Sequence, residues 1–451
     1  MVQRLGLNRR AFLRSAPITA LLGAVGTGSS RAADAPGTAA GKYDFDTPYD
    51  RVGTDCVKWD QQIRLFGREN IAVAMGIADM DFRCAPVITK ALTERMQHEN
   101  WGYLDVPRSF VDAIVNWNKR RYDIIINPDL LLLATGVHPA IISALRTFSP
   151  PGSKVLLLTP AYDGFYGDIS HVGCKPEECL MKIVNGRYAI DFEDLERHIS
   201  HDTNTLILCN PHNPTGNCWS REDLTTVGEI CTRRRVVVLA DEIHCDFVTK
   251  GNQYTPFSTL DNRDIVMNSI TFKSASKSFG LSALKCAWMF SDNADYINRV
   301  RANHRQDFNT LGMIAARAAL TEGTDWLDQL VSYIDANHDF VESFVNANLP
   351  LIKVVKPQGT YLNWLDVSRV AEKIGAQEQA AEANKQQDPS KKPITAEVMV
   401  QRHLIMNARV QLNPGSNYGY GGTGRMRMNI ATSRKTLELA LTNLAKALPR
   451  A

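Results

Sequence analysis

The sequence predicts an α/β protein with a large domain built on a mainly parallel sheet and a smaller α+β domain at the C-terminus. Short apolar runs recur between residues 130 and 290, and segments of helical periodicity separate them. Such alternation is typical of βαβ units, which produce parallel strands. From about residue 326 the pattern changes to a long amphipathic helix, then short strands and a final helix. This change marks the expected start of the smaller domain.

The expected strands are the largely apolar runs 130–134, 155–159, 205–209, 236–240, 269–272 and 287–290. Before them, Phe110, Ile114 and Trp117 stand at helical spacing and predict a helix over 108–121 with one buried face. Residues 371–393 are rich in Ala, Glu, Gln and Lys without an apolar stripe, so we expect a solvated insertion. We therefore predict a large domain over 76–325 and a small domain over 326–451, to which part of residues 36–75 contributes.

The composition is that of an ordinary globular protein with ample material for a core, because the 451 residues are 44% apolar and 22% charged. The formal net charge is +3, and residues 1–35 carry five arginines against one aspartate, a net +4. The rest of the chain is therefore near −1, the difference between these two values. This balance argues against nucleic acid or an anionic membrane as a partner. No run after residue 35 is apolar over the length that a bilayer requires.

Residues 1–35 have the pattern of a twin-arginine signal peptide. Arg9 and Arg10 lie in the sequence NRRAFLR, a mildly apolar stretch follows over 16–25, and Ala33-Asp34-Ala35 resembles a cleavage site. A disordered basic N-terminus that happens to contain two arginines is the alternative. The pattern predicts recognition by the twin-arginine export machinery, a mature protein in the periplasm or outside the cell, and a flexible polar arm to about residue 42.

The nine cysteines show no metal-ligand spacing, and their odd number leaves at least one thiol without a partner in the chain. Cys209, Cys231 and Cys286 fall in or beside apolar runs and are expected to be small core residues. Whether Cys174 and Cys179 pair is a question that the sequence leaves open.

The most informative segment is 271–285, where Lys277 stands among small and hydroxylated residues and Lys285 follows eight positions later. A lysine that forms a Schiff base must be held in place and free of bulky neighbours. The serines around it leave room for a ring and offer hydroxyls to a phosphate, to which Lys285 adds a positive charge. A lysine between serines is more often part of a solvated loop. The interpretation of this segment as a Schiff-base site therefore depends on three further segments upstream.

These three segments place further polar groups near the ends of expected strands. Residues 209–216 (CNPHNPTG) form a loop after one apolar run, and Asp241 ends another in 241–244 (DEIH). Residues 136–140 (GVHPA) separate an apolar run from an expected helix, an arrangement that presents backbone N–H groups to a phosphate. Doubly wound sheets bind ligands at the carboxyl ends of their strands. The four segments together predict one ligand site.

Together these segments resemble the fold-type I pyridoxal-phosphate (PLP) enzymes of the aminotransferase class I/II superfamily, from about residue 55 to the C-terminus. Residues 55–60 (DCVKWD), 78–82 (ADMDF), 101–103 (WGY), 241–244 and 359–362 (GTYL) are similar to the MalY/PatB-like branch of cystathionine β-lyases. The resemblance implies a PLP-dependent transferase-like large domain with PLP as cofactor, an amino-acid substrate and a homodimer with shared active sites.

The resemblance also implies roles for individual residues. PLP acts as an electron sink that the protein must hold and steer. Lys277 is expected to bind PLP covalently and to move the substrate's Cα proton as general base. Asp241 would pair with the pyridine nitrogen, although an acid after a strand is often only a helix N-cap. Asn213, in an otherwise ordinary turn, would bind the ring's 3-oxygen, and Tyr162 would stack on the ring unless it is simply a buried tyrosine.

Arg427 is expected to hold the substrate α-carboxylate with a fork that lysine cannot copy. Arg425 lies two positions earlier on the same strand face and is the competing assignment. The other implied cofactor-binding residues are Gly136, Val137, His138, Ser274 and Lys285 at the phosphate, Tyr103 reaching the phosphate from the other subunit, and His244 near the 3-oxygen. A structural role is equally compatible with His244.

The sequence departs from the branch at a few positions near the expected pocket. Asp163 and Gly164 follow Tyr162 where the branch usually has prolines, and Gly280 and Ala283 differ from the common run after the lysine. These positions affect the expected choice of substrate more than cofactor binding.

The residues named above serve two reactions, and the shape of the pocket decides between them. The resemblance favours β-elimination from cystathionine or other cysteine S-conjugates, giving pyruvate, ammonia and a thiol. The alternative is a class I/II aminotransferase acting on an amino acid and a keto acid. A PLP-fold protein that only binds ligands is disfavoured, because the lysine, the acid and the arginine are all present.

Overall fold

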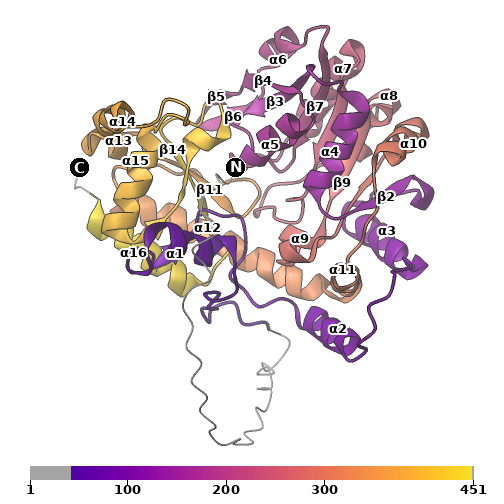
Figure 1. The fold of residues 1–451 in the computed structure, drawn as a ribbon, viewed down its shortest axis with the longest axis horizontal. Coiled ribbons are helices and arrows are strands. Elements are labelled where there is room, and N and C mark those ends of the chain that lie inside the picture. The colour runs from indigo at the N-terminus through magenta and orange to yellow at the C-terminus, as the bar shows by residue number, and fades with distance from the viewer. Residues whose placement is uncertain (1–41, 449–451) are drawn as a thin grey trace, which may run out of the picture. The chain divides into compact units, whose positions relative to one another are not determined.

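The computed structural model describes residues 42–448, and residues 43–448 belong to one compact unit (Figure 1). The signal peptide predicted for residues 1–35 and most of the arm behind it lie outside the described residues. A seven-stranded sheet forms the centre of the described unit. Its strands are β2 (Leu131–Ala134), β3 (Lys154–Thr159), β4 (Lys175–Leu180), β7 (Thr203–Cys209), β8 (Val237–Asp241), β9 (Ser269–Lys273) and β10 (Ala287–Phe290).

The strand order is β2-β10-β9-β8-β7-β3-β4. Every neighbouring pair is parallel except the two that β10 makes with β2 and β9. The prediction of an α/β fold with a mainly parallel sheet is thereby confirmed, and all six expected strands are present within two residues of their expected bounds. The seventh strand, β4, was not expected, because its sequence KPEECL is polar and lies at the edge of the sheet.

Helices cover both faces of this sheet, which explains why its inner strands are continuously apolar. One face packs against α4 (Val137–Phe148), α5 (Asp163–His171) and α10 (Ala294–Asn303), where Ile141 and Ile169 meet Leu157 and Leu239. The other face packs against α6 (Phe192–His198), α7 (Arg221–Arg234) and α8 (Arg263–Met267). In Figure 1, α4 lies across the near face of the sheet.

The C-terminal third forms a second, three-stranded antiparallel sheet in the order β11-β14-β13, with bounds Leu362–Asp366, Arg425–Asn429 and Asn413–Pro414. The long helix α12 (Thr324–Asn348) and the last helix α16 (Arg434–Ala447) pack together beside it. The N-terminal strand β1 (Val73–Ala74) joins this region by pairing with β12 (Val410–Gln411). The sequence-based boundaries between large and small domain stay a prediction.

The remaining elements surround these two sheets. They are the hairpin β5 (Lys182–Val184) and β6 (Arg187–Ala189), and the helices α1 (Gln62–Phe66), α2 (Pro86–Met96), α3 (Arg108–Tyr122), α9 (Ala275–Ser278), α11 (Thr310–Glu322) and α15 (Ala396–His403). Helix α3 confirms the helix expected over 108–121, with Phe110, Ile114 and Trp117 buried.

The insertion predicted over 371–393 is largely exposed, as expected of a solvated segment, but much of it is helical. The segment contains the end of α13 (Ser368–Lys373) and all of α14 (Ala376–Lys385), which contacts α15. Ala376 and Ala380 are buried one helical turn apart, and alanine both favours helix and allows close packing. The Asn384 side chain also exchanges two 2.8 Å hydrogen bonds with the backbone of Ile394. A face of alanines was therefore enough to anchor a segment that lacks larger apolar residues.

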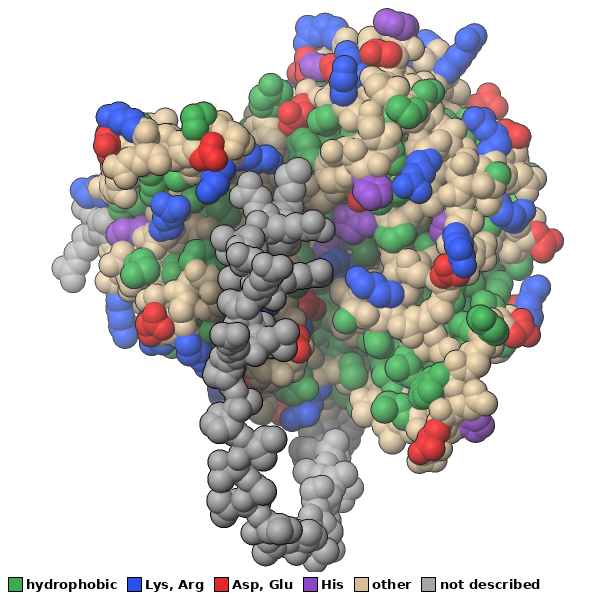
Figure 2. Space-filling view, in the orientation of Figure 1, with side chains coloured by type: hydrophobic (Ala, Val, Ile, Leu, Met, Phe, Trp, Pro, Cys, Tyr) green, Lys and Arg blue, Asp and Glu red, His purple; other side chains and the backbone are tan. Residues whose placement is uncertain are grey.

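All nine cysteines are free thiols. The Cys174 thiol donates to the carbonyl oxygen of Ser149 at 3.5 Å, while the Cys179 thiol lies 3.5 Å from the Asp194 carboxylate. The pairing that the sequence left open does not occur in this structure. No helix among residues 42–448 has the length and hydrophobicity needed to cross a membrane. On the face seen in Figure 2, basic and acidic side chains alternate over the surface.

Candidate active site

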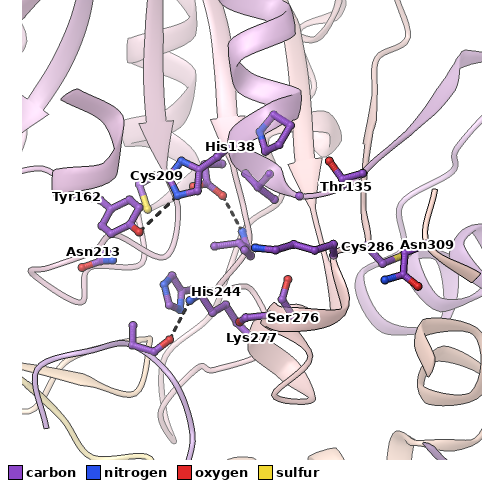
Figure 3. A pocket seen from close by; sticks show the side chains of 18 of the residues that line it. Thr135, His138, Tyr162, Cys209, Asn213, His244, Ser276, Lys277, Cys286 and Asn309 are labelled. Atoms are coloured by element: carbon purple, nitrogen blue, oxygen red, sulfur yellow. Dashed lines mark hydrogen bonds between the residues drawn. The ribbon is translucent and has the colours of Figure 1, made fainter. Parts of the chain in front are cut away.

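A cavity of about 670 Å³ opens at the carboxyl ends of β7 and β8 (Figure 3). Strands β7 and β8 end there at Cys209 and Asp241, while α9 follows β9 and α4 follows β2. Nine of the twelve predicted site residues line the cavity: Gly136, Val137, His138, Tyr162, Asn213, Asp241, His244, Lys277 and Lys285. The segments that the sequence placed at separate strand ends are thus brought together.

Asp241 is the buried acid of this cavity, with 4% of its surface exposed. Its Oδ1 accepts the backbone N–H of Ile243 at 3.1 Å, which caps the turn over 243–246, but no helix begins there. Burial raises the pKa of Asp241 to about 6, and the Ile243 N–H, His138 and Lys277 oppose that rise. A carboxylate kept in such surroundings is best stabilised by a cation in the cavity, and a protonated ring nitrogen fits that need.

Lys277 lies on α9, a single turn that the Ser274 hydroxyl caps by accepting the Ser276 N–H at 3.0 Å. The Lys277 ammonium donates to the carbonyl oxygen of Ala78 at 2.9 Å. Burial lowers the pKa of Lys277 to about 8; Asp79 opposes this shift and Arg427 adds to it. An amine with this pKa is partly neutral near neutral pH, as a nucleophile or a general base must be.

Arg427 and Arg425 occupy the same strand, β14, but have different surroundings. Arg427 is 2% exposed and donates through Nη1 to Asn213 Oδ1 at 3.1 Å and through Nη2 to Gly76 O at 2.8 Å. Its Nε has no partner among the described residues. Arg425 instead forms an ion pair of 3.2 Å with Asp366 and lines a separate surface cleft. The Arg427 guanidinium therefore has a donor in reserve beside the cavity, which agrees with its expected role.

The backbone of residues 76–79 connects several of these side chains. Four consecutive carbonyl oxygens there accept hydrogen bonds from side chains that are distant in sequence. Gly76 accepts from Arg427, Ile77 from Asn429, Ala78 from both Lys277 and Tyr361, and Asp79 from Lys58 and Asn429. Gly76 is glycine for a steric reason: an added Cβ would lie 2.5 Å from the Gln411 amide.

His244 is buried, and burial lowers its pKa well below the usual value, so the imidazole is neutral. Its Nδ1 has no hydrogen-bond partner among the described residues although its ring lies against Tyr361. Because buried polar atoms are rarely left unpaired, this nitrogen indicates a ligand in the cavity.

The other end of the cavity is formed by the first turn of α4, whose Gly136, Val137 and His138 supply free N–H groups, and by Lys285. Ser276 lines the cavity, whereas the Ser274 hydroxyl donates to the Cys286 carbonyl oxygen at 2.7 Å. Ser274 does not line the cavity in this structure, and its expected phosphate contact stays a prediction.

Tyr103 also lies away from the cavity. Its side chain is fully exposed and borders a separate surface cleft together with Arg95 and Arg317. This placement leaves the predicted reach into a second subunit as a prediction.

Sequence reasoning missed several residues that line the cavity. Ala78 and Ser276 belonged to segments that had been singled out, so a signal for them existed. Asp307, Phe308 and Asn309 also line it, but they precede α11 in a loop without a recognisable pattern. Asp168, which does not line the cavity but contacts His138, was missed because the two residues lie on different helices.

The donors around the cavity fit PLP. A half-buried amine, a buried acid and the N-terminus of α4 with Lys285 are the groups that a carbonyl, a pyridine nitrogen and a phosphate require. The unpaired His244 Nδ1 is a further group that a ligand would satisfy.

Comparison with known proteins agrees with this fit. The family model described as aminotransferase class I and II matches residues 70–444. The chain is 35% identical to the cystathionine beta-lyase PatB of Bacillus subtilis over 409 residues, covering 90% of this chain and 99% of that protein.

Two solved structures contain PLP in the same fold. A PLP-bound putative aminotransferase from Clostridium difficile superposes with a TM-score of 0.80 at 30% identity, covering 90% of this chain and 100% of the other. A PLP-bound C-S lyase from Staphylococcus hominis gives a TM-score of 0.77 at 27% identity, covering 90% and 98%. With its fold, its cavity and its matched sequence in agreement, the chain belongs to the aminotransferase class I and II family of PLP-dependent enzymes.

Proposed function

We propose that the protein is a carbon–sulfur β-lyase that cleaves cystathionine or other cysteine S-conjugates to pyruvate, ammonia and a thiol. The observation that carries the proposal is the likeness to PatB, which extends over 90% of the chain at 35% identity. The C-S lyase of Staphylococcus hominis, similar over the same share of the chain, supports it.

The residues in and beside the cavity have clear tasks in such a reaction. Arg427 holds the substrate carboxylate, Lys277 takes the Cα proton, and Asp241 stabilises positive charge on the ring nitrogen of PLP. When bound, PLP supplies the electron sink that makes the Cα proton acidic. Loss of the Cβ–S bond releases the thiol, and water then converts the remaining fragment into pyruvate and ammonia.

A class I/II aminotransferase is the second candidate, because the similar protein from Clostridium difficile carries that name. Incubation of the purified enzyme with cystathionine, with and without an added keto acid, distinguishes the two. We expect pyruvate and free thiol in equal amounts without the keto acid. Turnover that requires a keto acid and yields a new amino acid would contradict the lyase proposal and leave the cofactor site unaffected.

Substitution of Arg427 tests the grip on the substrate. We expect Arg427→Lys to lower kcat/KM by about 10²–10³-fold, since a single ammonium cannot replace a buried fork that also holds Asn213 and Gly76. The matched control is Arg425→Lys on the same strand, which should lower kcat/KM less than about fivefold because Arg425 is already paired with Asp366. A larger loss in the control than in Arg427→Lys would reverse the assignment.

We also propose that the enzyme is exported through the twin-arginine pathway to the periplasm or beyond, on the evidence of residues 8–35 alone. Replacement of both Arg9 and Arg10 by lysine should leave the protein in the cytoplasm with PLP bound, as cell fractionation and cofactor absorbance would report. Unchanged delivery of this variant would contradict the signal-peptide interpretation.

A homodimer with shared active sites completes the proposal. Its support is the full exposure of the Tyr103 side chain, which is unusual for a large aromatic group and typical of a residue that a partner covers.

A further inference from the structure

His138 has a side chain whose surroundings the cofactor assignment does not use. Its backbone belongs to the first turn of α4, but its imidazole turns toward α5 and lines the cavity (Figure 3). The Nδ1 atom lies 2.6 Å from Asp168 Oδ2, and the Nε2 atom lies 3.4 Å from the Tyr162 hydroxyl. The imidazole thus lies between a carboxylate and the tyrosine expected to stack on the ring.

The pair is built into the fold rather than lying on the surface. Asp168 keeps only 8% of its side chain exposed, whereas His138 keeps 44%, and this exposed part borders the cavity. Gly164 makes room for the arrangement, because a Cβ there would lie 2.6 Å from both His138 Cε1 and Tyr162 Cε1. The Asp168 carboxyl therefore lies behind the imidazole, and the imidazole faces the cavity.

The charged groups around His138 determine its state. Burial lowers the pKa of His138, but the hydrogen bond and the charge of Asp168 outweigh it, Asp241 adds to the rise, and Lys277 opposes it; the net shift is upward. The exposed His171 on α5 also lowers the pKa of Asp168. A protonated His138 in turn lowers the pKa of Asp241 by more than Asp168 raises it.

We propose that His138, held by Asp168, is a positioning residue that keeps a positive charge beside the buried Asp241 carboxylate and so maintains the ionised acid that the PLP ring nitrogen requires. The inference concerns cofactor binding and is the same for a lyase and for an aminotransferase.

Three variants test it. His138→Gln removes the charge and keeps an N–H donor, and Asp168→Asn removes the group that holds the imidazole. His171→Gln is the matched control, because it removes an exposed histidine of α5, the helix that carries Asp168. The measurements are the dissociation constant of PLP between pH 5.5 and 8.5 and the titration of the His138 imidazole by NMR in the protein without PLP.

In the unaltered protein, PLP affinity should fall as the pH drops through the pKa of Asp241, because the protonated acid cannot pair with a cationic ring. In His138→Gln this fall should begin at a pH higher by about half to one unit, so that PLP binds about 3–8-fold more weakly at pH 5.5. Asp168→Asn should move it in the same direction but less, because that variant also removes the negative charge of Asp168, which raises the pKa of Asp241. At pH 8.5 the affinities should agree within about twofold. The His138 titration should move to lower pH in Asp168→Asn, and His171→Gln should leave PLP binding unchanged.

Two results would overturn the proposal. Equal weakening of PLP binding at every pH would mean that His138 acts only through packing or the phosphate. An unshifted midpoint in His138→Gln would mean that its charge does not reach Asp241.

Discussion

Lys277→Ala is expected to lose the visible absorbance of bound PLP and to lower turnover by at least about 10⁴-fold. On the proposed roles, the variant removes both the amine that binds the cofactor and the base that takes the Cα proton, and the second role alone is typically worth about 10²–10⁴-fold. Absorbance of the purified protein and trapping with borohydride measure the first effect, and steady-state kinetics the second.

Lys277→Arg is the control for this experiment, because it keeps a positive charge in the buried site but cannot supply a neutral amine at neutral pH. It should be as inactive as Lys277→Ala. In the unaltered protein without PLP, capture of the cofactor should become faster as the pH rises to about 8 and then level off, since the pKa of Lys277 is lowered to about 8 and only the neutral amine reacts. A borohydride-stable adduct on Lys277→Ala would show that another lysine binds PLP.

Asp241→Asn is expected to lower kcat by about 10³-fold while the fold persists. An amide cannot supply the negative charge that holds the ring nitrogen protonated, and loss of one preorganised electrostatic group typically costs 10²–10³-fold. The substituted side chain keeps an oxygen that accepts the Ile243 N–H. Asp241→Glu, which keeps the charge, should recover part of the activity.

Thermal unfolding separates this effect from damage to the fold. The pKa of Asp241 is raised to about 6, above the value of an unfolded chain, so its ionisation disfavours the folded state without PLP as the pH rises through about 4 to 6. At pH 8 the PLP-free Asp241→Asn protein should therefore be at least as stable as the unaltered one, by up to about 3 kcal/mol. A lower melting temperature would assign Asp241 a structural role instead.

The parts of the fold that could be read from the sequence are those that burial dictates. Strands such as β8 are covered by helices on both faces, and this requires a continuous apolar run that is visible in the sequence. The edge strand β4 and the alanine-rich α14 could not be read in the same way. Their places depend on pairing with β3 and packing against α15, which are tertiary contacts without a local signature.

The site shows the same division. Asp241 ends one strand and Lys277 follows another. The rule that ligands bind at the carboxyl ends of strands brings the two residues together without coordinates. The choice between Arg425 and Arg427 could not be made from strand periodicity, because both side chains lie on the same face of the strand. It depends on Asp366, which lies opposite Arg425 on the neighbouring strand and pairs with it. The sequence predicted that His138 binds the phosphate through its loop. Its side-chain contact with Asp168 joins two helices that only the fold places side by side.

The carbonyl oxygens of residues 76–79 connect the lysine expected to react with the substrate and the arginine expected to bind its carboxylate. Lys277 and Arg427 hold the same short stretch of backbone two residues apart, at Ala78 and Gly76. If Lys277 leaves Ala78 to react, as the proposed function requires, the stretch loses one of its hydrogen bonds, while Arg427, the proposed carboxylate ligand, stays bound to Gly76. The proposed function therefore predicts that reactivity at the Lys277 amine and affinity for the substrate carboxylate depend on the same backbone. Gly76→Ala would displace the stretch, because the added Cβ would clash with the Gln411 amide. This change should weaken reactivity at the amine and affinity for the carboxylate together, although it alters neither Lys277 nor Arg427.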